Sequence, residues 1–297
     1  MSNNALISKA LTSNAGDLSL TRGMAKEKGT IRLAAIDLDG TLLSPQGKLT
    51  ARNAEAIRRA CEAGVSVVLA TGKSRASATW IIDELDMHMP GVFTQGTTVY
   101  DAEGAIWRST TMAQEAAASV LRFAEARSFP YLVYAGQRLL MAEDAPFRRQ
   151  MHEQYDEPLP EIVGSLLPQL ETISINKIVV YDPVDEGTAR QALQALCEHR
   201  AHVTQAVRHF VEVLPAGASK GAGLRWLLAQ MGIAPSEALA IGDGENDIEM
   251  LQTVGVGVAM GNAHPRVKAV ADQVVGSHAE SGVAEALARF VLGWADR

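Results

Sequence analysis

The sequence predicts an α/β protein, with a parallel-sheet core into which a smaller α+β module is inserted. Apolar runs at 31–36, 65–70 and 238–241 are too short for helices and indicate buried strands. Each run ends in a polar turn followed by a helical segment, the strand–helix rhythm of a parallel sheet. Between about 108 and 206, strands and helices alternate without such polar turns, which indicates a separate module.

Length and composition narrow the class of protein. At 297 residues the chain exceeds a typical single domain, so we expect two. The net charge of −7 argues against nucleic acid or an anionic membrane surface as a partner. No apolar stretch approaches the length of a membrane span. Cys61 and Cys197 lie in expected helices without metal-ligand spacing, which favours reduced thiols in a cytoplasmic protein.

Residues 1–30 differ from the rest of the chain, because they are rich in Ser, Asn, Ala and Thr and lack an apolar signal core. We expect a mobile leader without a catalytic role. The basic residues of this stretch make an organelle transit peptide a second interpretation, which Asp17 and Glu27 weaken. Met24 is a further candidate start, because the first strand begins soon after it.

The first strand ends in the acidic turn Asp37-Leu38-Asp39-Gly40-Thr41. In an extended chain, two carboxylates two residues apart point to the same side. Their repulsion requires a cation or a shared proton, and their oxygen atoms suit Mg²⁺. An ordinary Asp-Gly turn after a strand is the alternative, so this motif alone leaves both interpretations open.

The core continues with alternating helices and strands. Thr50 is the expected N-cap of a helix that runs to about Ala63 and ends at Gly64. The second strand ends in Thr71-Gly72-Lys73, which offers a hydroxyl, a backbone amide and a helix N-terminus to an anion. A simple capping turn explains these residues as well. Further strands are expected at 91–94, 97–100 and 105–107.

The inserted module is expected to begin at 108 and to end at 206. Its expected helices are 113–127, 145–155 and 185–199. Its expected strands are 131–134, 138–141, 173–181 and 202–207. The segment 211–215 is then expected to return the chain to the core, which would comprise 31–107 and 207–297.

The second half of the core contains two more polar turns. Lys220 begins a helix expected to end near Met231, although a cation is disfavoured at that end of the helix dipole. The strand at 238–241 ends in Gly242-Asp243-Gly244-Glu245-Asn246-Asp247, a further acidic turn. The remaining expected elements are strands at 254–260 and 272–275 and a closing helix at 283–294.

The order of the acidic turns, the hydroxyl turn and the helix-start lysine resembles the haloacid dehalogenase superfamily of phosphohydrolases. The stretches at 37–43 and 242–250 are close matches to the family pattern. The nearest branch resembles the Cof-type phosphatases, which carry an inserted type IIB α/β cap. The resemblance covers about 31–297 and implies a Rossmann-like core, with 108–206 as the cap that selects the substrate.

The resemblance also implies a role for each motif residue. Asp37 would be the nucleophile that forms an aspartyl-phosphate, and Asp39 the general acid and base. Mg²⁺ would be held by the Asp37 carboxylate, the Asp39 backbone carbonyl and Asp243. The phosphoryl group would be bound by the Leu38 amide, Thr71, the Gly72 amide, Lys220 and Asn246. Asp247 would support the metal shell or orient Lys220.

Two positions depart from the family pattern without belonging to the core chemistry. Lys73 stands where arginine is common. A guanidinium can donate two parallel hydrogen bonds to an anionic group, whereas the ammonium group of lysine acts as a single point charge. Gln95 stands where asparagine is usual. Five cap side chains could face the substrate, although such residues more often belong to the scaffold: Tyr134, Arg138, His152, Lys177 and His209.

These observations predict a Mg²⁺-dependent phosphatase that hydrolyses small phosphate monoesters, either sugar phosphates or cofactor and vitamin phosphates. The expected partner is a small phosphorylated metabolite, and the expected assembly is a monomer or a homodimer. A phosphomutase of the same superfamily is the first alternative. A non-catalytic protein that binds phosphate or Mg²⁺ is the second, which the intact pair of Asp37 and Asp39 disfavours.

Overall fold

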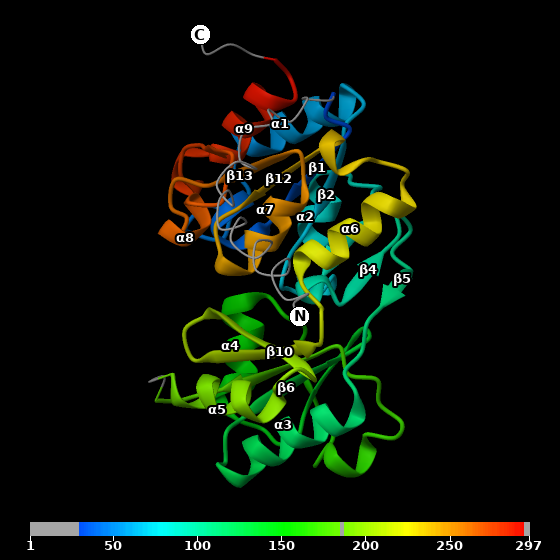
Figure 1. The fold of residues 1–297 in the computed structure, drawn as a ribbon, viewed down its shortest axis with the longest axis vertical. Helices are drawn as coiled ribbons and strands as arrows, with labels where there is room; N and C mark the ends of the chain where they lie inside the picture. The colour runs from blue at the N-terminus through cyan, green and yellow to red at the C-terminus, as the bar shows by residue number, and fades with distance from the viewer. Residues whose placement is uncertain (1–29, 185–186, 294–297) are drawn as a thin grey trace, which may run out of the picture.

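The computed structural model describes residues 30–184 and 187–293. Figure 1 shows two stacked parts, the core above and the cap below. The core sheet comprises β1 (Leu33–Ile36), β2 (Ser66–Leu69), β12 (Ala238–Gly242), β13 (Val256–Ala259) and β14 (Gln273–Val274). Its strands are parallel, in the order β14-β13-β12-β1-β2. The predicted fold class is confirmed, whereas the leader up to residue 29 and the end of the closing helix at Trp294 lie outside the described residues.

Helices cover both faces of the core sheet. They are α1 (Ala51–Glu62), α2 (Thr79–Glu84), α6 (Lys220–Gln230), α7 (Ile248–Thr253), α8 (Pro265–Lys268) and α9 (Gly282–Phe290). The chain moves from β1 to β2 in one direction along the sheet and from β12 to β13 in the other. Because parallel crossovers are right-handed, α1 and α7 lie on opposite faces. Helix α9 packs on α1, and α6 packs on α7.

The core strands are apolar because both of their faces are covered. Every residue of β1 and β12 is buried, as a doubly covered parallel sheet requires. The expected cap of α1 is present, since the Thr50 hydroxyl accepts a hydrogen bond from the Asn53 amide at 3.2 Å. The buried strands and the helix cap expected from the sequence of the core are therefore present in its structure.

A small antiparallel sheet leads from the core to the cap. Its strands are β3 (Gly91–Phe93), β4 (Thr98–Tyr100) and β5 (Ile106–Ser109). A parallel bridge between Ala70 and Val92 connects it to the end of β2. The turn between β3 and β4 consequently lies next to the polar turn that follows β2.

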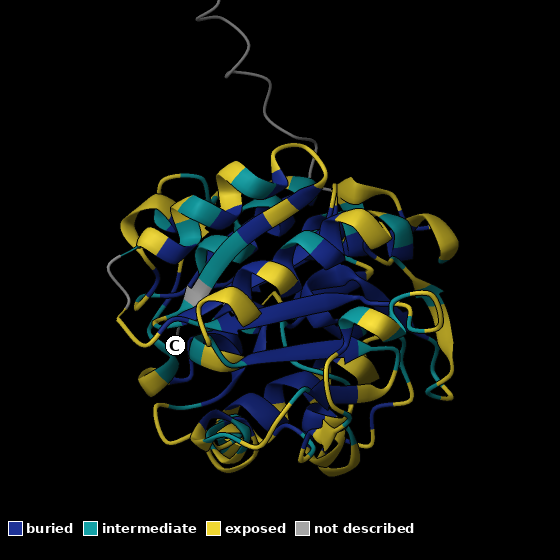
Figure 2. Ribbon diagram, turned by 90° about the horizontal axis from the view of Figure 1, so that it is seen from below, coloured by how far each residue is buried: buried dark blue, intermediate teal, exposed yellow. Residues whose placement is uncertain are grey.

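The cap is built on a six-stranded sheet in the order β10-β11-β9-β6-β7-β8. The strands are β6 (Tyr131–Ala135), β7 (Arg138–Met141), β8 (Glu161–Ile162), β9 (Lys177–Tyr181), β10 (Ala201–Val207) and β11 (Phe210–Pro215). The helices are α3 (Gln114–Ala126), α4 (Pro146–Tyr155) and α5 (Thr188–Cys197). Alternate residues of β6 enter two separate apolar clusters, one with α3 and α5 and one with α4. Figure 2, seen from the cap end, shows buried strands in the middle of the view with partly exposed helices around them.

The position of β11 differs from the prediction. The segment 211–215 was expected in the core, but β11 lies between β10 and β9 in the cap sheet. All of its residues are buried, because it is a central strand with side chains covered on both faces. A covered central strand has the same apolar sequence in either sheet, and the chain therefore leaves the cap sheet at Pro215 instead of 206.

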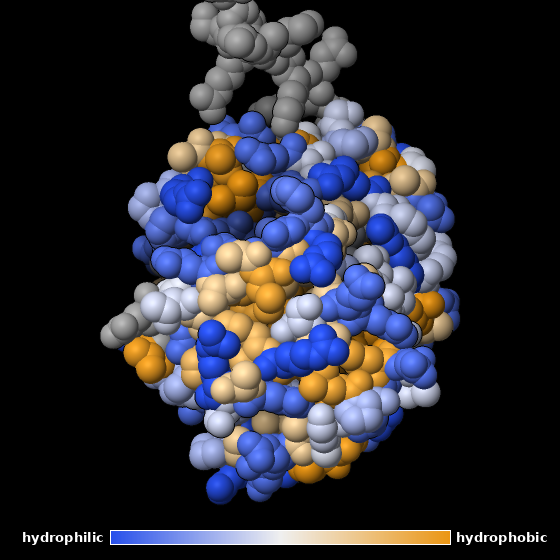
Figure 3. Space-filling model, turned by 60° about the horizontal axis from the view of Figure 1, so that its bottom comes forward, coloured by the Kyte–Doolittle hydropathy of each residue, from blue (hydrophilic) through white to orange (hydrophobic). Residues whose placement is uncertain are grey.

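The outer surface of the cap end is chemically mixed. Figure 3 turns this end forward and shows apolar patches interrupted by hydrophilic side chains. Among the described residues, no helix combines the length and the apolar character needed to cross a membrane.

Candidate active site

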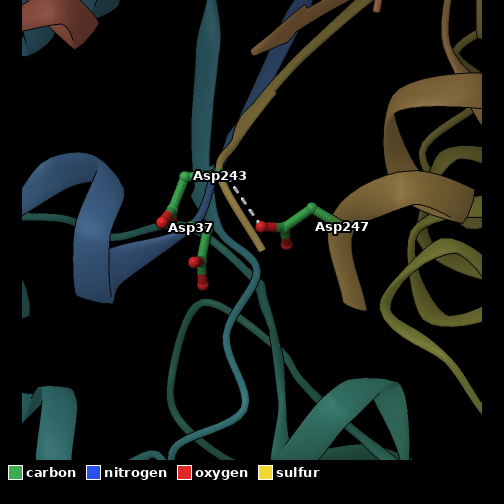
Figure 4. A group of neighbouring side chains, drawn as sticks. All are labelled: Asp37, Asp243 and Asp247. Carbon is green, nitrogen blue, oxygen red and sulfur yellow. Dashed lines mark hydrogen bonds between the residues drawn. The ribbon is translucent and has the colours of Figure 1, made fainter. Parts of the chain in front are cut away.

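The acidic turns lie at the carboxyl ends of adjacent core strands. Asp37 follows β1 and Asp243 follows β12, and these strands pair in register with Ile36 opposite Ile241. The two carboxylates therefore lie side by side at this edge of the sheet, as Figure 4 shows. The strand order reverses between β1 and β12, and open parallel sheets bind their ligands at such a reversal.

Asp37, Asp243 and Asp247 form a compact acidic cluster, in which one carboxylate oxygen from each lies within 4.8 Å of the others. Burial, and then repulsion by Asp247, raises the pKa of Asp37 well above its usual value, although Lys220 opposes the shift. Burial also raises the pKa of Asp243 to about 6. Buried carboxylates are stabilised in their charged form by a nearby cation, and their oxygen donors are those that Mg²⁺ prefers. The cluster fits such an ion.

Lys220 supplies a cation to this cluster. Its Nζ donates to Asp37 Oδ1 and to Asp247 Oδ1, both at 2.7 Å. Burial alone would lower the pKa of Lys220, but attraction by Asp247 and Asp37 outweighs it, so the pKa lies above its usual value. The cluster offers three carboxylates to one ammonium group, so a further cation is needed to balance the charge of its fully ionised form, which accounts for the affinity we expect for a metal ion.

The carboxylate of Asp247 is occupied by groups of the protein. While Oδ1 accepts from Lys220, Oδ2 accepts from the backbone amides of Asp243 at 3.0 Å and Gly244 at 2.9 Å. Figure 4 shows Asp247 reaching across to the Asp243 turn. Of the two roles that the sequence left open for Asp247, this geometry favours orienting Lys220.

Asp243 is oriented by residues to which the sequence analysis gave no role. Thr41 Oγ1 donates to Asp243 Oδ1 at 2.8 Å, and Asn262 Nδ2 donates to Asp243 Oδ2 at 3.3 Å. Asn262 Nδ2 also donates to the Gly40 carbonyl at 2.8 Å. Thr41 belongs to the first motif, which was a signal for it. Asn262 lies in no motif and becomes recognisable only in the folded chain.

Asp37 and Asp39 lie in different surroundings. The side chain of Asp37 is 8% exposed and that of Asp39 is 58% exposed. Lys73 Nζ lies 3.3 Å from Asp39 Oδ1 and 3.8 Å from Asp156 Oδ2. One carboxylate is therefore fixed by buried contacts, while the other remains accessible to a ligand and to water.

A cavity of about 170 Å³ separates these groups from the cap. Its core wall is formed by Asp37, Asp39, Thr71, Gly72, Lys73, Gln95, Lys220, Asp243, Gly244 and Asn246. Its cap wall is formed by Tyr134, Met151, Tyr155, Glu157, Lys177, Val179, Val207, Phe210 and Glu212. The cavity thus brings together most of the predicted site residues. The side chain of Leu38 is buried in the core, so only its backbone is available to a ligand.

The five cap residues singled out from the sequence separate into two groups. Tyr134 and Lys177 line the cavity. Arg138 forms an exposed ion pair, and His152 and His209 bond to backbone carbonyls of the cap. The structure therefore brings two of the five to the site.

Two buried glutamates of the cap had no signal in the sequence. Glu157 accepts hydrogen bonds from Ser74 Oγ at 2.5 Å and from the Ser74 amide at 3.1 Å. Glu212 Oε1 accepts from Lys177 Nζ at 3.0 Å, and the same Nζ donates to the Gly72 carbonyl at 2.8 Å. Both contacts hold the cap against the polar turn after β2.

A family model of haloacid dehalogenase-like hydrolases matches residues 34–287 of the chain. The chain belongs to this family. The matched residues include both acidic turns and the whole cap. The residues of both cavity walls therefore lie within the region that the family model covers.

Individual relatives agree with the family assignment. This hydrolase is 35% identical to the chloroplastic endoribonuclease YBEY of Arabidopsis thaliana over 86% of this chain and 46% of that protein, about half its length. It is 29% identical to the 5-amino-6-(5-phospho-D-ribitylamino)uracil phosphatase of Bacillus subtilis over 89% of this chain and 99% of that one. A Cof-like hydrolase of Plasmodium vivax has a similar structure, with a TM-score of 0.82, 26% identity and coverage of 91% and 99%. The predicted membership of the Cof-type branch is confirmed.

Proposed function

We propose that this hydrolase is a Mg²⁺-dependent phosphatase that acts on small phosphate monoesters, namely sugar phosphates or cofactor and vitamin phosphates. The observation that carries the proposal is the setting of Asp37. Its carboxylate faces the cavity, is held by Lys220 at 2.7 Å, and lies beside a second, accessible aspartate, Asp39. The phosphatase among the relatives supports the same reaction class.

In this mechanism, a carboxylate oxygen of Asp37 attacks phosphorus and forms an aspartyl-phosphate, while the bond between phosphorus and the alkoxide oxygen breaks. Asp39 gives its proton to the leaving alkoxide. It then takes a proton from the water that attacks the phosphorus atom, which releases inorganic phosphate and restores Asp37. The exposure of Asp39 suits this exchange of protons with substrate and water.

The proposed metal ligands are the carboxylates of Asp37 and Asp243 and the backbone carbonyl of Asp39. Mg²⁺ bound there would offset the repulsion between a carboxylate nucleophile and an anionic phosphate. Thr41 holds one oxygen of Asp243 from the side at 2.8 Å. That contact fixes the direction in which the second oxygen of the carboxylate points.

The proposed phosphoryl ligands surround the same end of the cavity. They are the Leu38 amide, the Thr71 hydroxyl, the Gly72 amide, Lys220 and Asn246. Thr71 Oγ1 accepts from the Lys73 amide at 3.2 Å, which leaves its own proton for a phosphoryl oxygen. Removal of one such donor typically costs about 3 to 4 kcal/mol of transition-state stabilisation.

Hydrolysis of an aryl phosphate, with Mg²⁺ and with EDTA, tests the proposal. We expect metal-dependent turnover in the wild type and its loss in Asp37→Asn, because an amide is a poor nucleophile. Full activity of that variant, after deamidation and contamination are excluded, would contradict the mechanism. Phosphoryl transfer to a sugar in place of water would identify a mutase, and phosphate binding without turnover would identify a binding protein.

The proposed location is the cytoplasm, with organelle targeting as the alternative. One relative is described as chloroplastic. This description supports organelle targeting more strongly than the composition of residues 1–30 does. The candidate targeting segment, residues 1–30, lies almost wholly outside the described residues.

A further inference from the structure

A buried hydrogen-bond relay crosses from the core to the cap at the wall of the cavity. Gln95, in the turn between β3 and β4, is 2% exposed. Its Nε2 donates to Glu212 Oε2 on β11 at 2.6 Å. Its Oε1 accepts from Asn246 Nδ2 at 3.1 Å. One carboxamide thus joins a strand of the cap to a proposed phosphate ligand.

Glu212 determines the direction of this relay. An ionised carboxylate only accepts hydrogen bonds, so Gln95 must present its NH₂ group to Glu212 and its carbonyl oxygen to Asn246. Asn246 must then turn its own NH₂ group towards Gln95, which leaves the second N–H of that group for the cavity. If Asn246 were flipped, it would present a carbonyl oxygen to an anionic phosphoryl group and repel it.

Glu212 is itself fixed within the cap sheet, by a lysine that also bonds to the core. Its other oxygen, Oε1, accepts from Lys177 Nζ at 3.0 Å. The same Nζ donates to the carbonyl of Gly72 in the core at 2.8 Å and lies 4.1 Å from the centre of the Tyr134 ring. The ion pair of Lys177 and Glu212 lies within the cap sheet and orients Glu212 there. The bonds from Lys177 to Gly72 and from Gln95 to Glu212 form only when the cap is seated on the core, so Glu212 reaches Gln95 only in that arrangement.

The turn that carries Gln95 has an uncommon backbone conformation. Thr94, Gln95 and Gly96 have φ values of +52°, +58° and +83°. A Cβ on Gly96 would lie 1.9 Å from the carbonyl oxygen of Ser219, the residue before Lys220. Left-handed backbone at non-glycine residues costs free energy and persists where the surroundings hold it. The turn therefore packs against the start of α6, which fixes Gln95 relative to Lys220.

We propose that Gln95 is a positioning residue that makes phosphoryl binding by Asn246 depend on the seating of the cap, that is, on contact between the cap sheet and the core turns that follow β2 and β3. With the cap seated, Glu212 orients Gln95, and Gln95 orients Asn246 as a donor. When the cap moves away, both carboxamides lose the group that determines their direction. This inference rests on the role of Asn246 in the proposed function, but the binding of inorganic phosphate tests it separately from turnover.

The test replaces Gln95 by methionine, which has a similar size and no hydrogen-bonding amide. We measure the Kd of inorganic phosphate by calorimetry with Mg²⁺ present, and kcat/KM for an aryl phosphate, on the full chain. Outer-shell partners of this kind are typically worth about 10- to 100-fold in affinity or activity, and we expect losses of that size. Gln191→Met, an exposed position on α5, is the matched control and should leave both values unchanged.

A double-mutant cycle separates positioning from a general structural effect. If Gln95 acts through Asn246, adding Gln95→Met to Asn246→Ala causes little further loss, because the positioned group is already absent. A second variant, Lys177→Met with Glu212→Met, removes the cap end of the relay without changing the net charge. Apolar replacement of a buried ion pair is often neutral for stability, so this variant should fold and should reproduce the loss of phosphate affinity.

Several results would overturn the inference. These are unchanged phosphate binding in Gln95→Met, full additivity with Asn246→Ala, and a wild type that does not bind inorganic phosphate. A wild type that binds phosphate in a Gln95-dependent way but hydrolyses no ester would overturn the proposed function and leave the relay standing.

Discussion

At the scale of single residues, the arrangement of charge around β1 and β12 separates two aspartates that are only two positions apart. Asp37 is buried and held by Lys220, whereas Asp39 is accessible and lies 3.3 Å from Lys73. Burial favours a fixed nucleophile, and accessibility favours a group that exchanges protons. The same type of side chain can therefore serve two roles in one turn.

The raised pKa of Asp243 predicts how Mg²⁺ affinity depends on pH. Its pKa of about 6 in the folded chain exceeds the ordinary value of 3.8, chiefly because of burial. Without metal, the folded chain binds a proton more tightly than the unfolded chain, so this group adds stability as the pH falls through 6. Because protons compete with the ion at Asp243 and also at Asp37, whose pKa is raised by burial, we expect the affinity for Mg²⁺ to fall at least about tenfold per pH unit below 6.

Thermal unfolding with and without Mg²⁺ checks this prediction. The rise in Tm caused by Mg²⁺ should be large at pH 7.5 and much smaller at pH 5. Asp243→Asn should show little rise at either pH, because it loses a charged ligand. An equal rise in the wild type at both values of pH would contradict the prediction.

At the scale of elements, the turn after β1 depends on a glycine for two separate reasons. Gly40 has a φ of +77°, and a Cβ there would lie 2.3 Å from Asp243 Oδ2. Gly47 has a φ of +69° but no atom within 4 Å of such a Cβ. Both positions therefore require a left-handed backbone conformation, which glycine adopts readily. Only at Gly40 would a Cβ atom also collide with a neighbouring side chain.

Alanine at these two positions should separate stability from activity. We expect both Gly40→Ala and Gly47→Ala to lower the free energy of unfolding by about 1 kcal/mol or more, because both place a side chain on left-handed backbone. Only Gly40→Ala should also abolish Mg²⁺-dependent turnover, because it displaces Asp243. Denaturant unfolding and aryl phosphate hydrolysis measure the two effects, and retained turnover in Gly40→Ala would refute the second.

The core elements and their motifs were predictable from the sequence because their signals are local. A buried strand, a polar turn and a capped helix follow one another within a few residues, as at β1 and α1. The assignment of β11 was wrong because an apolar central strand does not reveal which sheet it joins. Glu157 and Glu212 were missed because their partners in the core, Ser74 and Gln95, lie 83 and 117 residues away.

At the scale of the whole molecule, the seating of the cap on the core involves buried polar contacts as well as packing. Ser74 Oγ donates to Glu157 Oε2 at 2.5 Å, and Lys177 Nζ donates to the Gly72 carbonyl at 2.8 Å. Polar contacts exchange with water more easily than apolar packing does, because both states can be hydrogen-bonded. Such an interface suits a cap that must admit a substrate and release a product.

Loss of the Ser74 hydroxyl should weaken this seating. Hydrogen bonds to charged groups contribute about 1.5 to 3 kcal/mol, so we expect Ser74→Ala to raise KM for an aryl phosphate by about tenfold or more. We expect a smaller change in kcat, because Asp37 and Lys220 are untouched. Ser119→Ala is the control, at a partly exposed serine of α3 whose hydroxyl donates only within its own helix, to the Glu115 carbonyl. An unchanged KM in Ser74→Ala would show that this contact does not limit substrate binding.

The placement of β11 has a consequence for building chimaeras. If caps were exchanged between relatives at residue 206, the transplant would leave β11 and Glu212 with the recipient core and remove their pairing strands. An exchange that extends through Pro215 would transfer the whole sheet and rejoin the recipient just before Ser219 and Lys220. The natural graft boundary of this protein is therefore the short link between its last cap strand and the helix that begins at Lys220.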